Sequence, residues 1–484
     1  MLTDTETREL ERSIEEIWEI ALEMGYDPYP IHFEVVPVHV IYELGAYSLP
    51  ARFSHWTFGR DYHRQKTSYE YGMSKIYEIV FNTDPCQAFL MDSNSMLSHK
   101  LTVAHVIGHC HFFKHNSYFA HTDRRMIEKV RLHRDRIAQY EQEFGWREVE
   151  NFLDAVMCIE EHFDPTSPIL RRVEPGKAAP GKRDEGRRTS EYDDLWTMMG
   201  TESAPKPRHR KFPEEPEKDL LLFLAAYGRD LEDWQRDILS IVREEMLYFL
   251  PQMRTKIMNE GFASLAHERI LERYLNKPED IWEFRRLHSG VLSPSPSPGS
   301  INPYYVGFQI LKDIERRWDG NLQEGDEPET DWLGKAKARP EGEGWKKVFE
   351  VCEEESDVSF LRKYLTENLV KRLDLYTYKR EEADGEERWV VQSTDWQQVR
   401  DQMVDGMTNF GVPIIRVEDA DFERRGELYL THAHDGKDID LEYAGRVLRA
   451  VNKIWGRPVH LETQVENERT RLSFDGTENK QETL

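Results

Sequence analysis

The segment AHVIGHCHFF, residues 104–113, places His105 and His109 four residues apart in an otherwise apolar stretch. On a helix this spacing puts both imidazoles on one face, one turn apart, so that both can bind the same metal ion. The alternative is a pair of buried rings that are hydrogen-bonded to the backbone. His111 and His115 have the same spacing but point to a different face, and we expect that pair to be less buried.

A downstream segment supplies a candidate third ligand. NEGFAS, residues 259–264, resembles the second helix of HExxH aminopeptidases, in which the glutamate of an NEGxA segment binds zinc, and this resemblance points to Glu260. Two histidines, one glutamate and a water make up an open catalytic zinc site. The same helical stripe carries Glu245 and His267 among apolar neighbours, which favours a buried polar network over a solvated face.

One residue departs from the HExxH pattern. The general base of that motif directly follows the first histidine, and Val106 occupies this position. Valine cannot take a proton from water, so hydrolysis would need a carboxylate from elsewhere, for which we choose Glu245, with Glu244 beside it. Otherwise the site does not hydrolyse peptides. His267 is then expected to orient a ligand or to transfer protons.

Other polar and aromatic residues are weaker candidates. An aromatic-rich loop more often serves packing, and alternating histidines beside a turn more often lie on the surface. The residues in this class are His55, Trp56, His288, Tyr304 and Tyr305, as possible lining of a cleft, and His432 and His434, as a possible second metal pair.

Composition limits the class of protein. The chain has 484 residues, 39% of them hydrophobic, and a formal net charge of −25, which argues against nucleic-acid binding because phosphates require a basic surface. No stretch approaches the roughly 18 apolar residues of a membrane span, and the first residues lack a signal peptide. Four dispersed cysteines without a CxxC pair are typical of a reducing cytoplasm, so we expect a cytoplasmic protein.

The elements that must position these residues suggest an α+β protein. We expect residues 1–165 to form a mainly helical, zincin-like region with a small mixed sheet. The Pro- and charge-rich residues 166–218 are expected to form a partly disordered linker, and residues 219–370 a second helical part of the same core. In residues 371–484 strands and helices follow in the order β, β, α, β, β, α, β, β, which contains the split βαββαβ arrangement and predicts a small ferredoxin-like domain.

Several long segments resemble the SpoVR family, named for stage V sporulation protein R. They include RFSHWTFGRDY, YEIVFNTDPCQAFLMDSNS, AHVIGHCHFF, NPYYVGF and FLRKYLTENLV, and the resemblance extends over nearly the whole chain. It implies a link to spore cortex formation in sporulating species and to a stress response in others. It also implies a PrkA-type serine kinase and a von Willebrand-type protein as partners. It implies no established reaction.

The residues and the resemblance together favour a zincin-like protein with one divalent metal, expected to be zinc, held by His105, His109 and Glu260. If the protein is an enzyme, metal-assisted hydrolysis of an amide bond is the expected reaction class. The alternative, which Val106 favours, is a non-catalytic, metal-stabilised scaffold or regulator that works with the kinase.

Overall fold

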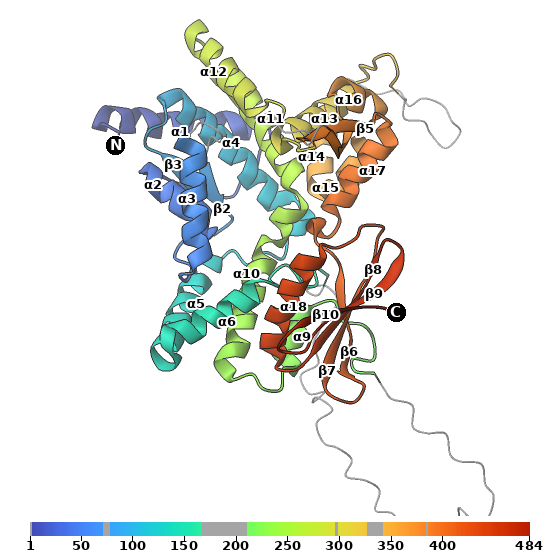
Figure 1. The fold of residues 1–484 in the computed structure, drawn as a ribbon. Helices are drawn as coiled ribbons and strands as arrows, with labels where there is room; N and C mark the ends of the chain where they lie inside the picture. Colours follow the sequence, from blue (N-terminus) through green and yellow to red (C-terminus); the bar gives the residue numbers. More distant parts are fainter. Residues whose placement is uncertain (1, 71–77, 167–210, 296–298, 327–341, 384–385) are drawn as a thin grey trace, which may run out of the picture. The chain divides into compact units, whose positions relative to one another are not determined.

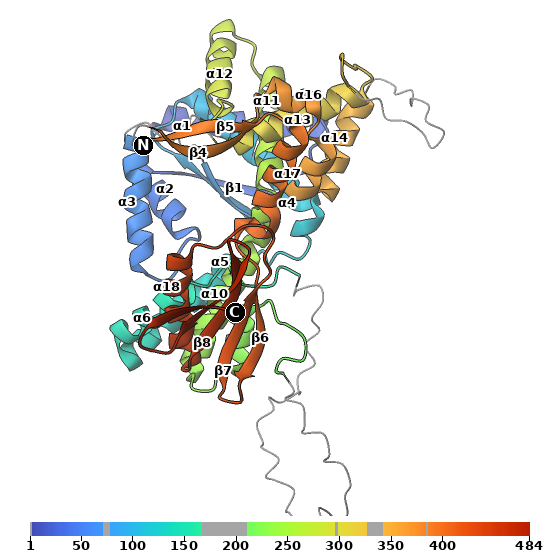
Figure 2. The same ribbon diagram turned by 45° about the vertical axis from the view of Figure 1, so that its right-hand side comes forward.

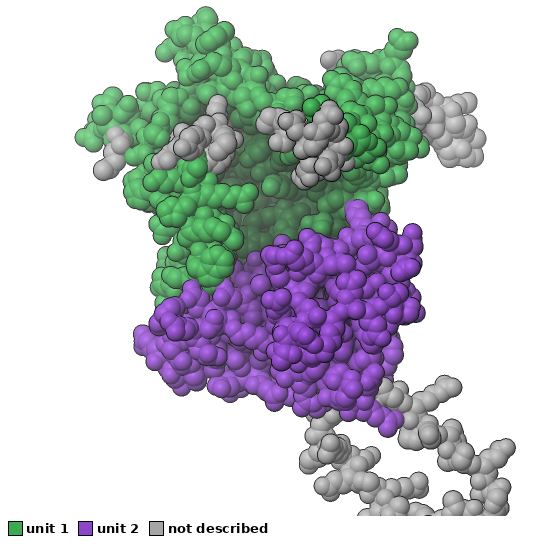
Figure 3. Space-filling model, in the orientation of Figure 1, with its two compact units in different colours: residues 1–138, 248–411 green, residues 139–247, 412–484 purple. Residues whose placement is uncertain are grey.

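The structure, a computed structural model, describes residues 2–70, 78–166, 211–295, 299–326, 342–383 and 386–484. These residues divide into two compact units, coloured separately in Figure 3. The first unit contains residues 1–138 and 248–411, and the second contains residues 139–247 and 412–484. Each unit is therefore built from two segments that are distant in the sequence.

The first unit is mainly helical. Its helices are α1 (Asp4–Glu23), α2 (Val38–Tyr47), α3 (Trp56–Glu70), α4 (Met96–His115), α5 (Met126–Tyr140, whose last residues fall in the second unit), α11 (Lys256–Tyr274), α12 (Pro278–Val291), α13 (Pro303–Trp318), α14 (Glu343–Glu354), α15 (Asp357–Tyr364), α16 (Glu367–Arg372) and α17 (Trp396–Met407). Short 3-10 turns follow α4 (Ser117–Phe119) and α17 (Thr408–Gly411). Helix α4 is buried along most of its length, and the middle of α11, from Ile257 to Leu271, is also largely buried although it carries several polar residues.

Close helix packing in this core depends on glycine residues at the points where two helices meet. A Cβ added at Gly108 of α4 would lie 2.8 Å from the Cα of Ala263 on α11, so only a glycine allows this approach of the two helices. A Cβ at Gly307 of α13 would lie 2.0 Å from the carbonyl oxygen of Ile257. The backbone of α11 therefore packs closely against α4 and against α13, and Figure 1 shows these helices running through the unit.

A small mixed sheet lies beside these helices. Its strands are β1 (Ile31–Val36), β2 (Glu78–Phe81) and β3 (Cys86–Met91), in the spatial order β1-β3-β2. Strand β3 runs parallel to β1 and antiparallel to β2, and both β2 and β3 contact α4. The predicted helical region with a small mixed sheet is thus confirmed. A separate hairpin of β4 (Thr377–Ala383) and β5 (Glu386–Ser393) also belongs to the first unit.

The second unit combines helices with a five-stranded sheet. Its helices are α6 (Trp146–Met157, preceded by a π-turn at Glu141–Gly145), α9 (Leu220–Tyr227), α10 (Asp233–Arg254, whose end belongs to the first unit) and α18 (Leu441–Trp455). Its strands are β6 (Ile415–Phe422), β7 (Glu427–His432), β8 (Val459–Val465), β9 (Glu468–Phe474) and β10 (Asn479–Thr483). In the order β10-β9-β8-β7-β6, only β7 and β8 are parallel, and α18 connects them against the sheet, as Figure 2 shows.

This topology corrects the expected ferredoxin-like domain. The split βαββαβ arrangement needs four strands on one sheet and two crossover helices, whereas this sheet contains a single crossover helix because β5 belongs to a separate sheet with β4. Helix α17, which contacts β4 of the first hairpin, packs instead against α15 and α16 of the first unit. Most of the predicted linker, residues 166–218, lies outside the described residues, but Glu217 at its end pairs with Val417 of β6. Among the described residues, no helix is long and apolar enough to cross a membrane.

Candidate metal centre

Helix α4 carries the two predicted histidine ligands on one face. The ring centroids of His105 and His109 lie 4.6 Å apart, and both side chains are buried. Asn259 fixes the second ring, because its Oδ1 lies 2.9 Å from His109 Nδ1 and an amide oxygen can only accept. His109 therefore donates from Nδ1, and its Nε2 presents a lone pair to the centre.

Glu260 reaches the same point from α11. Its Oε2 lies 3.5 Å from His109 Nε2 and 3.7 Å from His105 Nε2. The start of α11 is fixed by Asp357, whose carboxylate accepts hydrogen bonds from the backbone N–H groups of Ile257 and Met258 at 2.9 and 3.0 Å. The structure thus brings together the three residues that the sequence nominates as ligands.

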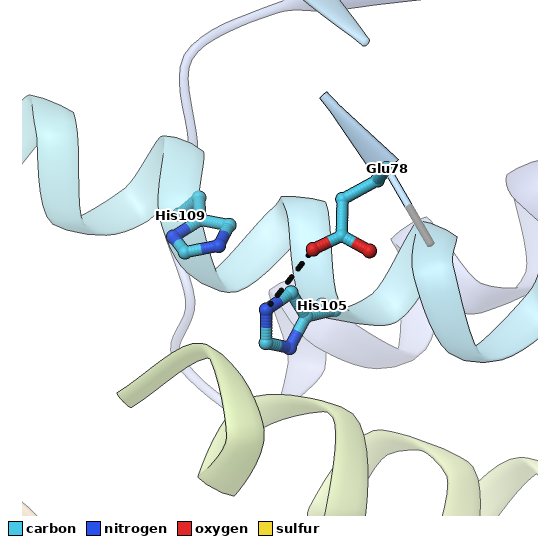
Figure 4. A group of neighbouring side chains, drawn as sticks. All are labelled: Glu78, His105 and His109. Atoms are coloured by element: carbon cyan, nitrogen blue, oxygen red, sulfur yellow. Dashed lines mark ion pairs between the residues drawn. The ribbon is translucent and has the colours of Figure 1, made fainter. Parts of the chain in front are cut away.

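A fourth residue, Glu78 at the first position of β2, completes the cluster and was not predicted. Its Oε1 lies 3.5 Å from His105 Nε2, the contact drawn in Figure 4. The ligand atoms of Glu78, His105 and His109 all lie within 4.8 Å of one another. The sequence signal was an acidic residue at the edge of an apolar strand, YEIVF, but nothing local indicates that this strand lies beside α4.

The charges of the cluster favour a cation. Burial acts to lower the pKa of His105, but the negative charges of Glu78 and Glu260 outweigh it and raise that pKa. Burial acts to raise the pKa of Glu260, but the adjacent imidazoles of His105 and His109 outweigh it and lower that pKa. Burial and the charge of His105 lower the pKa of His109 to about 4. Two carboxylates thus converge beside two imidazoles, and this arrangement favours a positive charge at their meeting point.

Two of these atoms have unmet hydrogen-bonding capacity. His105 Nε2 and Glu260 Oε2 are both buried without a hydrogen-bond partner among the described residues. Buried polar atoms in proteins are nearly always paired, so an unpaired pair aimed at one point is the arrangement expected for ligands of an ion. Tyr304 flanks the cluster, with its ring stacked 5.9 Å from that of His105. Burial, followed by the charge of Glu260, raises the pKa of this phenol, which therefore stays neutral.

The remaining candidates lie elsewhere or in supporting positions. His267 Nδ1 is 2.9 Å from His105 Nδ1, and His288 contacts His267 in turn. Glu245 is buried on α10 in the second unit, so its role as a base stays a prediction. His55 contacts Thr57 and Trp56 next to α3, and Tyr305 lines a cavity of about 690 Å³ near the β4–β5 hairpin.

The second histidine pair on α4 is engaged by Asp27. The backbone N–H of Asp27 donates to His111 Nδ1 at 2.8 Å, and its carboxylate lies 3.1 Å from His115 Nε2. In the second unit, His432 Nδ1 lies 2.9 Å from Thr463 Oγ1, and His434 Nε2 lies 3.0 Å from an oxygen of Asp438. Each of these rings has a protein partner.

Comparisons with known proteins match nearly the whole chain. A family model described as SpoVR like protein matches residues 4–412, and one described as SpoVR-like C-terminal domain matches residues 413–466. The chain is 29% identical over 482 residues to a protein of Escherichia coli (strain K12) described as uncharacterized protein YcgB, with 93% of this chain and 91% of that protein covered. No solved structure matches. The boundary between the two family models falls where the second unit resumes, at residue 412.

Proposed function

We propose that this chain, which belongs to the SpoVR family, binds one divalent metal ion through His105, His109 and Glu260 and uses it to hydrolyse an amide bond. The observation that supports the proposal is the convergence of three ligand atoms at separations of 3.5 and 3.7 Å. Two ligands bound at about 2.1 Å to a tetrahedral zinc ion lie about 3.4 Å apart. The separations therefore suit a shared ion better than direct hydrogen bonds, which are shorter.

The donor set limits the metal. Two imidazoles and a carboxylate suit zinc with an open fourth position, and they also make up the facial set that binds iron(II) in oxygenases. No thiol takes part, since Cys110, which follows His109, is buried beside Cys86. Zinc remains our expectation for a hydrolase, because it polarises a carbonyl and acidifies water without redox chemistry.

Glu78 is the proposed general base. Val106 cannot serve, but Glu78 approaches the centre from the strand side and its side chain remains partly accessible. Burial raises the pKa of Glu78 above its ordinary value, which brings this carboxyl closer to the range in which it can accept and return a proton. Glu245 remains the second candidate for this role.

Replacing Glu260 or Glu78 by glutamine tests whether the first is a metal ligand and the second is the general base. We expect purified wild type, loaded with Zn²⁺ and dialysed, to hold about one ion per chain by mass spectrometry. Glu260→Gln should lose the ion. Glu78→Gln should keep it but lose hydrolysis of a fluorogenic peptide library by about 10²–10⁴-fold. Retention of a full equivalent of metal by Glu260→Gln would contradict the ligand set.

A non-catalytic role is the second candidate, and the burial of Val106 in the apolar core supports it. In that case the metal stabilises a scaffold or regulator. The variant Val106→Glu restores the HExxH pattern and separates the two functions: peptidase activity in this variant alone would identify the natural protein as non-catalytic. A PrkA-type kinase, a von Willebrand-type partner and a role in spore cortex or stress remain proposals that rest on the family resemblance only.

A further inference from the structure

A row of imidazoles leads away from the metal centre. His105 Nδ1 lies 2.9 Å from His267 Nδ1, and His267 Nε2 lies 2.7 Å from His288 Nδ1. At the far end, His288 Nε2 lies 3.6 Å from Oε1 of Glu268. The four residues come from α4, α11 and α12, and all are buried. The proposed metal ligand is therefore connected to a carboxylate through two further rings.

The end groups fix the direction of every hydrogen bond in this row. Each close nitrogen–nitrogen contact holds one proton, because two lone pairs or two N–H groups facing each other would repel. A metal ligand must offer the lone pair of Nε2, so His105 carries its proton on Nδ1 and donates it to His267. His267 then donates from Nε2 to His288. His288 is left with an N–H group that faces Glu268, as a carboxylate requires.

Basic side chains hold the terminal carboxylate in place. Lys312 Nζ lies 3.0 Å from Glu268 Oε2, and a guanidinium nitrogen of Arg285 lies 3.6 Å from Oε1. Glu268 is thus anchored at the edge of the core with one oxygen directed toward His288. If the row ran in the opposite direction, a lone pair of His288 would face this carboxylate and His105 could not bind a metal.

We propose that His267, His288 and Glu268 are positioning residues that set the tautomer of His105 and strengthen its bond to the metal. The inference rests on the proposed metal binding and extends it to residues that touch neither the ion nor a substrate. A carboxylate that accepts from a ligating histidine makes that ligand more basic, and here the same effect is transmitted through two intervening rings.

The test compares two glutamates on the same helix. Glu268→Gln removes the terminal charge and keeps the size of the side chain, whereas the matched control Glu272→Gln removes a charge one turn away that also pairs with Arg285. The affinity of the full-length chain for Co²⁺ would be measured by competition with a chelator, together with the visible absorption of the bound Co²⁺. We expect Glu268→Gln to weaken binding by about 10-fold or more and to shift the Co²⁺ spectrum, with Glu272→Gln unchanged.

A second variant keeps the test decisive if Glu268→Gln fails to fold. His288→Gln interrupts the row at its middle, and its helical content would be checked by circular dichroism. It should weaken Co²⁺ binding at least as much as Glu268→Gln does. Wild-type affinity and an unchanged spectrum in folded Glu268→Gln and His288→Gln would overturn the positioning role while leaving the metal site intact. Absence of Co²⁺ binding in wild type would overturn the proposed function itself, and this inference with it.

Discussion

Histidines cluster both in the helical core of the first unit and on the sheet of the second unit, but their hydrogen bonding differs. On the sheet, His460 Nδ1 lies 2.8 Å from Ser473 Oγ, and His460 Nε2 lies 2.8 Å from Glu427 Oε2, so both ring nitrogens are engaged. In the helical core, His105 Nε2 and Glu260 Oε2 face each other at 3.7 Å with no hydrogen-bond partner among the described residues.

The difference shows what separates a structural cluster from a candidate binding site. Neighbouring strands place paired residues directly opposite each other, as His460 and Ser473 are, so polar side chains satisfy one another. Helices α4 and α11 hold their polar groups farther apart, at separations that an ion can bridge. Both regions contain closely spaced histidines, four residues apart in the helical core and two apart in the second unit, so it is the unsatisfied atoms that mark the candidate site.

Removing histidines from each region tests most directly which of the two clusters binds metal. The double variant His105→Ala, His109→Ala should lose all bound metal, because two of three ligands are gone. The double variant His432→Ala, His434→Ala should keep about one ion per chain. Elemental analysis of both proteins after dialysis would check this. Metal that follows the sheet pair would show that the satisfied cluster is the site.

Acid should affect the metal-free helical core before the sheet. Burial lowers the pKa of both His109 and His288 to about 4, against about 6.5 in an unfolded chain. Between these values the unfolded chain binds more protons, so stability falls as pH decreases from about 6.5 to 4, by up to about 1.4 kcal/mol per pH unit for each ring.

The sheet should respond mainly at lower pH. Burial acts to raise the pKa of Glu427, but its hydrogen bonds to His460 and Arg425 lower it, so this contribution is lost only below about pH 4.5. The pKa of His432 is lowered by burial, but this ring is only partly buried. Hydrogen-exchange protection factors, which correct for the intrinsic pH dependence of amide exchange, should therefore be lower at pH 5 than at pH 7 in α4 and α11 and change little in β7 and β8. Equal acceleration in both regions would contradict the assignment.

Close helix packing gives a smaller, local effect. Gly307→Ala places a methyl group against the Ile257 carbonyl and should cost about 1–3 kcal/mol of unfolding free energy, as overpacking does. Gly59→Ala on α3 is the matched control, since nothing lies within 4 Å of its Cβ position, and it should stabilise by up to about 1 kcal/mol. Urea unfolding of both variants would measure the difference, and equal effects would show that the contact between α11 and α13 is not tight.

The smallest effect is expected on the sheet. Glu427→Gln removes the charge that pairs with His460 and Arg425 and should cost about 1 kcal/mol, with metal content unchanged. Thermal unfolding together with elemental analysis would check both statements. A loss of metal in this variant would mean that the sheet influences the centre.

Local sequence patterns predicted much of the site and most of the elements. A four-residue step on a helix is enough to pair His105 with His109, and the strands and helices from β4 to β9 lie where alternation and helical periodicity placed them. The run IHFEVVPVHVIY, residues 31–42, is rich in β-branched residues and its pattern favours one strand, but the strand ends before Pro37 and helix α2 begins directly after it.

The remaining features depend on long-range contacts that local patterns do not contain. Glu78 joins the centre only because β2 contacts α4, and Glu268 matters only because α12 brings His288 next to His267. Local patterns also do not show that residues 371–484 are divided between the two units. The β4–β5 and β6–β7 hairpins have similar sequence patterns but belong to different units. Pairing with distant strands, rather than local β-propensity, decides which sheet a strand joins.

The interleaved order of the two units has a consequence for synthesis on the ribosome. His109 and Asn259, which are hydrogen-bonded at the centre, are 150 residues apart, with the whole first segment of the second unit between them. At 5–20 residues per second, roughly 8 to 30 s separate their emergence. During that interval the apolar faces of α4 lack their partner helix. The proposed centre can therefore form only after α11 has emerged, so any metal that it binds must be loaded late in synthesis.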